Sequence, residues 1–326
     1  MKIRYGESIN NALSELMSEN QRVILIGEDL LDPYGGAFKI SKGLSTKFPN
    51  QVISTPISEA AFTGLGFGLA LKGYQVVVEI MFGDFVTLSM DQIINGLSKI
   101  SDMYGYRVPL SCVIRTPMGG RRGYGPTHSQ SLEYLFLGVP NLQLIAPSIF
   151  HNPGFLLKKN LKSSSPTIFV ENKILYSKTL LRDGDFGFQK KYHCQTDSVH
   201  LSYDLKNKGD YLIISYGGMA SIALEASQKL FLDFEFVVDL LVIGDLKIEL
   251  TNLKSFFDFK RYRKIVIAEE GVSGIWSAII FSKLQDLLHT SCLVKMVFAK
   301  ASSIPSAPKL EAKNLPGVED IVKVFT

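Results

Sequence analysis

The chain has 326 residues, of which 46% are hydrophobic and 20% charged, as expected for globular domains with sizeable cores. Its net charge of +4 comes from 35 basic and 31 acidic residues dispersed along the sequence, which excludes the clustered basic surface of a nucleic-acid-binding protein. Residues 1–16 lack a signal-peptide core and no apolar run is long enough for a membrane span, so we expect a cytoplasmic protein. Cys112, Cys194 and Cys292 are far apart, which predicts buried free thiols and no metal site.

Strands alternate with helices in the first half of the sequence. The predicted strands lie at residues 22–27, 52–54, 76–81, 110–115, 142–145 and 167–170, and the predicted helices at 7–19, 41–47, from 58 onward, from 85 to 104 and at 152–162. This alternation predicts a mostly parallel sheet with helices on both faces. We assign residues 1–180 to this first α/β domain.

The second half repeats the alternation after a polar stretch of mixed charge at residues 181–209, which we interpret as an inter-domain linker with room for short strands. The predicted strands lie at 211–218, 235–242, 264–269 and 293–298, and the predicted helices at 220–231, 250–259 and 273–288. Residues 210–326 are therefore predicted to form a second, smaller α/β domain.

Residues 55–85 run from a polar turn through a helix and a strand to the start of another helix. Ser58 is placed to cap the first helix, and Glu59 follows in the first helical turn, where the helix dipole favours a carboxylate. Phe85 follows the strand at the sheet edge where α/β folds usually bind ligands. An acid and an aromatic ring are thus expected at neighbouring strand ends.

Glycines mark two further features. Gly64 and Gly68 lie four apart on one helix, which predicts a close approach by another backbone. Residues 116–132 are rich in glycine and proline, as in long functional loops. Within this loop His128 could act as a general acid or an oxyanion donor, or could only hydrogen-bond to backbone.

Nine short segments between residues 27 and 176 form one ordered set. They read GED at 27–29, YGGAF at 34–38, TPISEA at 55–60, VEIM at 78–81, DF at 84–85, MDQIIN at 90–95, RTPMGG at 115–120, GYGPTHSQSLE at 123–133 and ENKILY at 171–176. In this order they resemble the β subunit of the thiamine-diphosphate-dependent 2-oxoacid dehydrogenases, with the pyruvate and acetoin dehydrogenases nearest. The resemblance implies a transketolase-like pyrimidine-binding domain followed by a transketolase C-terminal-like domain.

The resemblance also implies cofactor-binding roles. Glu59 matches the carboxylate that hydrogen-bonds to a ring nitrogen of the thiamine diphosphate pyrimidine. Such a carboxylate favours the imino tautomer, which deprotonates the thiazolium carbon. Met81 and Phe85 match residues that pack on the pyrimidine, and the Ile57 carbonyl matches an acceptor for its exocyclic amine.

Two further residues and several partners follow from the resemblance. His128 matches a residue that faces the 2-oxoacid substrate, and Glu28 an acid in a network linking two active sites. The α subunit of the family binds the diphosphate through Mg²⁺ with a Gly-Asp-Gly motif that this chain lacks, so we expect an α₂β₂ heterotetramer that serves a lipoyl acyltransferase core. Residues 163–165 read SSS where many members have Asp-x-Asn, which argues against K⁺.

Three functions are open at this point. We favour a β subunit for decarboxylation of a 2-oxoacid, most simply pyruvate, with acyl transfer to lipoamide. A carboligase that passes a two-carbon unit to an aldehyde or keto-sugar is the alternative, because residues 238–244 and 274–278 depart from the family pattern. A non-catalytic partner subunit is the third, against which the presence of Glu59, Phe85 and His128 argues.

Overall fold

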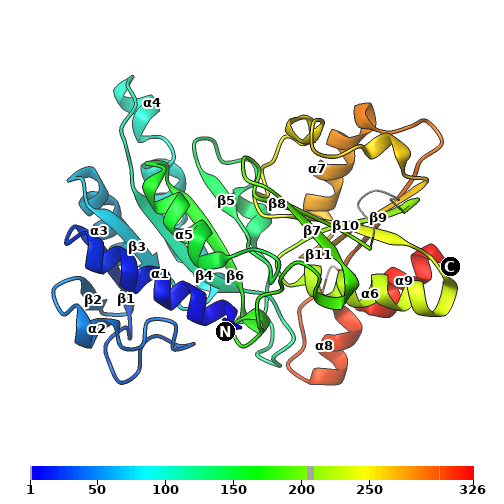
Figure 1. Cartoon of the computed structure of the whole chain (residues 1–326). Helices are drawn as coiled ribbons and strands as arrows, with labels where there is room; N and C mark the ends of the chain where they lie inside the picture. The colour runs from blue at the N-terminus through cyan, green and yellow to red at the C-terminus, as the bar shows by residue number, and fades with distance from the viewer. Residues whose placement is uncertain (1, 204–208, 301) are drawn as a thin grey trace. The chain divides into compact units, whose positions relative to one another are not determined.

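Two six-stranded sheets organise the chain, one in each of two units (Figure 1). The computed structural model describes residues 2–203, 209–300 and 302–326. Unit 1 comprises Met1–Met118, Leu135–Ile145 and Asn152–Thr179, and unit 2 comprises Gly119–Tyr134, Ala146–His151 and Leu180–Thr326. The glycine-rich loop, which we predicted within the first domain, therefore belongs to unit 2.

The sheet of unit 1 is entirely parallel. Its strands are β1 (Val23–Glu28), β2 (Val52–Thr55), β3 (Gln75–Glu79), β4 (Cys112–Met118), β5 (Gln143–Ile145) and β6 (Thr167–Asn172), in the order β2-β1-β3-β4-β6-β5. The central strands are buried throughout, as expected for apolar runs covered on both faces. The predicted strands are confirmed, although β3 ends before Met81, which lies just beyond the sheet.

Helices flank this sheet. They are α1 (Tyr5–Glu19), α2 (Leu44–Lys47), α3 (Glu59–Leu71), α4 (Ile100–Tyr104) and α5 (Pro153–Lys162). Figure 1 shows α1 and α5 packed side by side. The apolar side chains of α1 that recur at helical spacing are buried, among them Ile9, Leu13 and Leu16. The amphipathic pattern of the sequence therefore identifies the buried face of α1.

The single helix that we predicted from residue 85 to 104 is wrong. The segment instead forms a 3₁₀-helix at Gly83–Ser89, a π-helix at Gln92–Leu97 and the short α4. A Cβ atom at Gly96 would lie 3.1 Å from the ring of Phe67 on α3. The π-helix, which is wider than an α-helix, passes α3 at Gly96, where a larger residue would press against the ring of Phe67.

The close approach predicted at Gly64 and Gly68 is also wrong. A Cβ atom at Gly68 would meet none of the described residues within 4 Å, and one at Gly64 would meet Gln92 at an ordinary 3.7 Å. The tight position is Gly66, where a Cβ atom would lie 2.7 Å from Cγ2 of Val78 on β3. The helix therefore approaches the sheet through the glycine between the two that we singled out.

The sheet of unit 2 is mixed. Its strands are β7 (Gln189–His193), β8 (Ser198–Ser202), β9 (Tyr211–Tyr216), β10 (Val238–Ile243), β11 (Lys264–Val272) and β12 (Leu293–Ala299), in the order β12-β11-β9-β10-β8-β7. Strand β8 runs antiparallel to both β10 and β7, and the other pairs are parallel. The predicted linker at 181–209 thus supplies two strands of the second sheet; its residues 204–208 lie outside the described residues.

The helices of unit 2 are α6 (Met219–Phe234), α7 (Ile275–Leu284), α8 (Pro308–Asn314) and α9 (Val318–Phe325). Figure 1 shows α7 on one side of the second sheet and α6 with α9 on the other. The helix predicted at 250–259 is wrong, since only 3₁₀ turns form at Leu250–Leu253 and Phe259–Arg261. The rings of Phe257 and Phe259 pack together at 4.8 Å, and residues two apart do not share a helix face.

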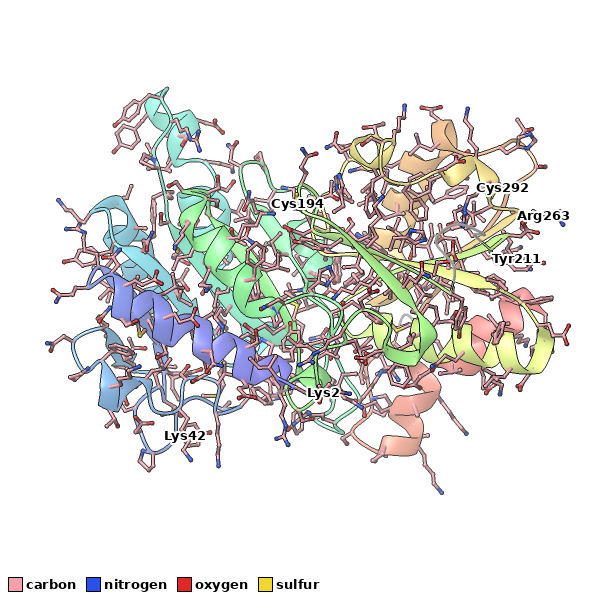
Figure 2. All side chains as sticks on the ribbon, in the orientation of Figure 1. Lys2, Lys42, Cys194, Tyr211, Arg263 and Cys292 are labelled. Atoms are coloured by element: carbon pink, nitrogen blue, oxygen red, sulfur yellow. The ribbon has the colours of Figure 1, made fainter. Side chains whose placement is uncertain are left out.

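The cysteines are free thiols, but not all are buried. Cys112 is buried in β4, whereas Cys194 is exposed and Cys292 is partly exposed, which corrects our expectation for the last two (Figure 2). No helix among residues 2–203, 209–300 and 302–326 combines the length and the apolar character needed to cross a bilayer.

Candidate active site

The carboxyl ends of the central strands of unit 1 meet at one edge of the sheet. Glu28, the last residue of β1, pairs with Thr55, the last residue of β2. Glu79, the last residue of β3, pairs with Gly27 on one side and Arg115 on the other. Open parallel sheets bind ligands at this edge. Two acids, Glu28 and Glu79, therefore end strands at the edge of the sheet where ligands are expected.

Glu59 begins α3, four residues after β2 ends. Ser58 occupies the N-cap position, but its side chain makes no capping hydrogen bond, so the predicted cap is wrong in this respect. Glu59 itself is only 5% exposed. No hydrogen bond or ion pair joins its carboxylate to another described side chain. The partial positive charge at the N-terminus of α3 favours this buried carboxylate.

Glu28 is a second buried acid beside Glu59. It is 4% exposed, and its Oε2 atom has no hydrogen-bond partner within the described part of the chain. Burial raises the pKa of Glu28, and the negative charges of Glu59 and then Asp29 raise it further. The fold thus brings Glu28 and Glu59 close enough for the charge of Glu59 to act on Glu28. The buried Oγ1 of Thr55 also lacks a partner among these residues.

Apolar side chains accompany the two acids. Ile57 is 78% exposed in the turn between β2 and α3. Met81 and Phe85 are partly exposed just after β3. The ring of Phe85 continues an aromatic row, in which the Phe85–Phe82, Phe82–Phe38 and Phe38–Tyr176 centroids lie 6.0, 5.4 and 5.3 Å apart. This edge therefore combines two carboxylates with apolar surface.

A buried ionic network supports the same edge, and our sequence analysis missed it. Arg115 donates to Glu79 at 2.6 Å and to both oxygens of Glu171 at 2.7 and 2.8 Å. Ser41 donates to Glu79 at 2.6 Å, and Tyr176 donates to Glu171 at 2.7 Å. Burial lowers the pKa of Arg115, but the attraction of Glu171 and Glu79 outweighs it and leaves the pKa raised.

The sequence does carry a signal for this network. Each of the mostly apolar strands β3, β4 and β6 has one charged residue: Glu79, Arg115 and Glu171. Such residues are almost never buried unless they are paired. Glu79 and Arg115, which are in register on adjacent strands, could have been predicted to be partners. Glu171 is in register with Pro117 instead, two residues beyond Arg115.

His128 lies in unit 2, on the glycine-rich loop, and is partly exposed. Its Nδ1 atom shares a hydrogen bond of 2.9 Å with the Thr127 hydroxyl, and its backbone N–H donates to Gly125 at 3.3 Å. Glu28, Ile57, Glu59, Met81 and Phe85 belong to unit 1. The predicted site residues are therefore divided between the two units.

Two further acids are buried in unit 2. Burial raises the pKa of Glu133 to about 7, although the hydroxyl of Tyr216, which donates to Glu133 Oε1, lowers it. Burial also raises the pKa of Glu269 to about 7, while the backbone N–H of Ser277 donates to Glu269 Oε1 at 2.8 Å. Both side chains are protonated in part near neutral pH.

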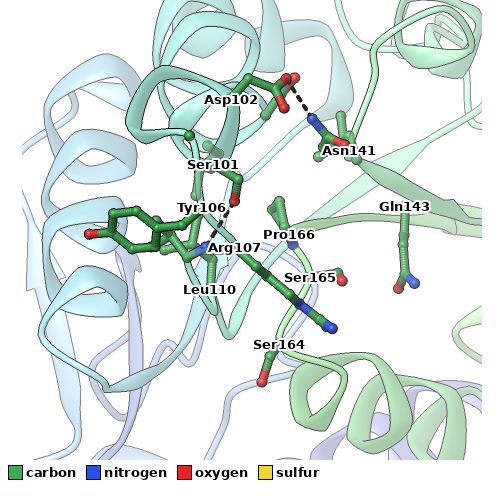
Figure 3. Close-up of a pocket in the computed structure, with 15 residues that line it drawn as sticks. Ser101, Asp102, Tyr106, Arg107, Leu110, Asn141, Gln143, Ser164, Ser165 and Pro166 are labelled. Carbon is green, nitrogen blue, oxygen red and sulfur yellow. Dashed lines mark hydrogen bonds between the residues drawn. The ribbon is translucent and has the colours of Figure 1, made fainter.

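A pocket of about 790 Å³ lies where the resemblance places a monovalent cation (Figure 3). Ser164 and Ser165 line it, together with Arg107. Asp102 is the one acid among the lining residues, and it accepts a hydrogen bond from Asn141 at 2.9 Å. The positive charge of Arg107 works against a bound cation here.

A known protein family and several known proteins are similar to this chain in sequence. Residues 1–179 match the family model of the transketolase pyrimidine-binding domain. The chain is 31% identical to the mitochondrial pyruvate dehydrogenase E1 component subunit beta-1 of Oryza sativa subsp. japonica, over 97% of this chain and 84% of that protein. It is 29% identical to the pyruvate dehydrogenase E1 component subunit beta of Rickettsia bellii, over 99% of this chain and 97% of that protein.

A solved structure, a split gene transketolase in an inactive beta4 tetramer, shares the fold with a TM-score of 0.73 at 18% identity, over 98% of this chain and 96% of that chain. Sequence identity above 30% over nearly the whole chain and a family model that covers more than half of it lead to the same assignment. This chain belongs to the family of pyruvate dehydrogenase E1 β subunits, with a transketolase pyrimidine-binding domain over residues 1–179.

Proposed function

We propose that this chain is the β subunit of a thiamine-diphosphate-dependent 2-oxoacid dehydrogenase that decarboxylates pyruvate and passes the acyl group to lipoamide. The observation that carries the proposal is Glu59, a buried carboxylate without a side-chain partner among the described residues, at the start of α3. It lies within the segment that matches the pyrimidine-binding family model. A buried acid without a partner costs stability, so a role in binding or catalysis accounts for it.

The residues at this edge fit an aminopyrimidine. A carboxylate such as Glu59 can exchange a hydrogen bond with a ring nitrogen, and the unpartnered Oε2 of Glu28 provides a second buried acceptor beside it. Phe85 and Met81 present an aromatic ring and a thioether, groups that pack well on flat heterocycles. The backbone carbonyl of the exposed Ile57 is our proposed acceptor for the exocyclic amine.

Thiamine diphosphate, when bound, supplies the carbon nucleophile and the electron sink for decarboxylation. The task of Glu59 is to hold a proton at the pyrimidine nitrogen, which the buried setting makes effective because little water competes for that hydrogen bond. Glu28, whose pKa is raised by burial and by Glu59, is suited to exchange protons with its neighbour. His128 would face the substrate as a general acid or hydrogen-bond donor.

A second subunit is part of the proposal. The sequence has no Gly-Asp-Gly motif, and the described residues include no group of three or more His, Cys, Asp or Glu that could hold a metal ion. We therefore assign Mg²⁺ and the diphosphate to an α subunit in an α₂β₂ complex that serves a lipoyl acyltransferase. We leave K⁺ out, and we propose a cytoplasmic location, although the rice relative is mitochondrial.

Co-expression with an α-like subunit tests the proposal. The purified complex would receive pyruvate, thiamine diphosphate and Mg²⁺, with an artificial electron acceptor in one reaction and acetaldehyde in another. We expect pyruvate-dependent dye reduction and acylation of lipoamide, with little carbon–carbon coupling.

Two outcomes would overturn this function. Formation of a hydroxyketone with little acylation of lipoamide would identify a carboligase. Failure to copurify with any α-like subunit, together with no activity on 2-oxoacids, would refute an active site shared with an α subunit.

A further inference from the structure

The glycine-rich loop of unit 2 has an unusual backbone. Every second residue from 119 to 125 has a positive φ: Gly119 (90°), Arg121 (70°), Gly123 (68°) and Gly125 (79°). Backbone turned in this way can direct neighbouring N–H groups toward one side and form a concave nest for an anion, and we call residues 119–125 the nest. Arg121 has a side chain in a conformation that favours glycine, so surrounding contacts must hold it there.

Two buried carboxylates occupy this concavity. Glu270 Oε1 accepts the N–H of Gly120 at 2.5 Å. Glu311 accepts the N–H of Arg121 on Oε1 at 2.8 Å and that of Gly123 on Oε2 at 3.0 Å. Glu270 lies on β11 and Glu311 on α8, and they are 4% and 3% exposed. The anion that the loop binds is thus part of the same unit.

The Arg121 side chain closes the arrangement. Its Nη2 donates to the carbonyl of Pro316 at 2.5 Å, and its Nε lies 3.5 Å from Glu270 Oε2. A Cβ atom at Gly120 would lie 2.6 Å from Leu315 Cδ1, so the loop packs closely against the segment that follows α8. The glycine-rich loop is therefore held in place both by hydrogen bonds and by packing against Leu315.

We propose that Glu270 and Glu311 are positioning residues that hold the His128 loop in its working conformation by accepting its backbone hydrogens. The connection to His128 is short, because its N–H donates to Gly125, the last positive-φ residue of the nest. Loss of a carboxylate leaves loop N–H groups without acceptors and releases the strain at Arg121. The catalytic part of this inference rests on the proposed function of His128.

Hydrogen exchange of the full chain tests the clamp without any activity measurement. In Glu311→Ala we expect the amides of residues 120–125 to exchange at least about tenfold faster, because two charge-assisted hydrogen bonds are lost. Glu319→Ala is the matched control, since Glu319 is an exposed acid of the nearby α9 that pairs with Lys229 at 2.6 Å. The control should leave the loop amides unchanged. Unchanged loop exchange in Glu311→Ala would overturn the clamp.

Peptides from β9 report whether each variant is folded. If Glu311→Ala loses protection there as well, Glu311→Gln and Glu270→Gln take its place. Glutamine keeps one acceptor oxygen, so we expect faster loop exchange than in the unmodified chain but slower than in the alanine variant. Equal exchange in the unmodified chain and both glutamine variants would overturn the clamp.

Activity of the complex with an α subunit tests the catalytic part. We expect Glu311→Ala to lower kcat about tenfold or more with a smaller change in KM for pyruvate, and Glu311→Gln to restore part of kcat. Faster loop exchange with unchanged kcat would overturn the link to His128. An unmodified complex without activity on pyruvate would instead overturn the proposed function, while the exchange data would still decide whether Glu311 holds the loop.

Discussion

Replacement of Glu59 by glutamine should separate function from stability. Glu59 is 5% exposed, has no side-chain partner among the described residues, and raises the pKa of the neighbouring Glu28 by its negative charge. A residue kept for structure should destabilise the chain when it is replaced. A residue kept for catalysis at the expense of stability should do the opposite.

The magnitude follows from two opposing effects. Removal of the Glu59 charge relieves its repulsion of the buried Glu28 carboxylate, a gain on the order of 1 to 2 kcal/mol for two neighbouring like charges near solvent. Loss of a carboxylate from the first turn of α3 costs about 0.3 to 1 kcal/mol of interaction with the helix dipole. We therefore expect Glu59→Gln to raise the free energy of unfolding by about 0.5 to 1 kcal/mol.

Activity should move in the opposite direction. A glutamine cannot exchange a proton with the pyrimidine, so kcat of the complex with an α subunit should fall by about 10² to 10⁴. Urea unfolding of the full chain at pH 7, followed by circular dichroism, measures the stability. Glu319→Gln, at an exposed acid of α9, is the control and should change neither quantity. A loss of more than about 1 kcal/mol in Glu59→Gln, or an unchanged kcat, would refute the reasoning.

Three further predictions concern the packing and the pH dependence of the fold. Arg115→Met should lower the free energy of unfolding by about 3 to 5 kcal/mol, because it leaves two buried carboxylates without their counter-charge. The control Arg263→Gln, at an exposed ion pair, should change the free energy of unfolding by less than about 0.5 kcal/mol. Gly66→Ala should cost about 1 to 3 kcal/mol of stability by a clash with a valine methyl of β3. Gly68→Ala places its methyl group where no described residue lies within 4 Å, so it should gain about 0.5 to 1 kcal/mol from helix propensity. Burial raises the pKa of Glu133 to about 7 from its ordinary value of 4.5, so the folded chain binds more protons than the unfolded chain between these values. Stability should therefore fall as pH rises through that window. Glu133→Gln should flatten this decline, which amounts to at most about 3 kcal/mol.

Urea titrations of the variants decide all three. Equal effects of Arg115→Met and Arg263→Gln would mean that the buried network adds nothing beyond a surface pair. Equal effects of Gly66→Ala and Gly68→Ala would contradict the close approach of α3 to β3. The Glu133 prediction fails if the variant and the unmodified chain lose stability in parallel between pH 4.5 and 7.

Local patterns in the sequence account for most of unit 1. Its strands are apolar runs bounded by turn residues, so their positions, and with them the parallel sheet, could be predicted. Glu59 and Phe85 follow β2 and β3, which are not neighbours because β1 lies between them, so our expectation of neighbouring strand ends is wrong. The electrostatic contact between Glu28 and Glu59 could be expected only once the strand order was known, because β1 lies between β2 and β3.

Prediction failed where neighbours in space overrule local preference. Strand β7 reads QKKYH and lies at the edge of the second sheet, so its exposed polar residues resemble a loop. The helix expected after Phe85 gives way to 3₁₀ and π geometry because Gly96 packs on a ring of α3. The partner of β7 is the nearby strand β8, whereas Gly96 contacts a ring that is 29 residues earlier in the sequence.

The loop that carries His128 shows the same limit at the candidate site itself. Its composition predicts freedom of movement, since glycines at alternate positions allow many conformations. The structure instead fills the loop with the carboxylates of Glu270 and Glu311, which lie 150 and 190 residues further along the chain from Gly120 and Arg121. The glycines allow the backbone to adopt the conformation that binds the two carboxylates. The hydrogen bonds to these carboxylates then restrict the motion of the backbone. A glycine-rich loop with buried acids on its amides is therefore better described as a rigid mount for His128 than as a flexible lid.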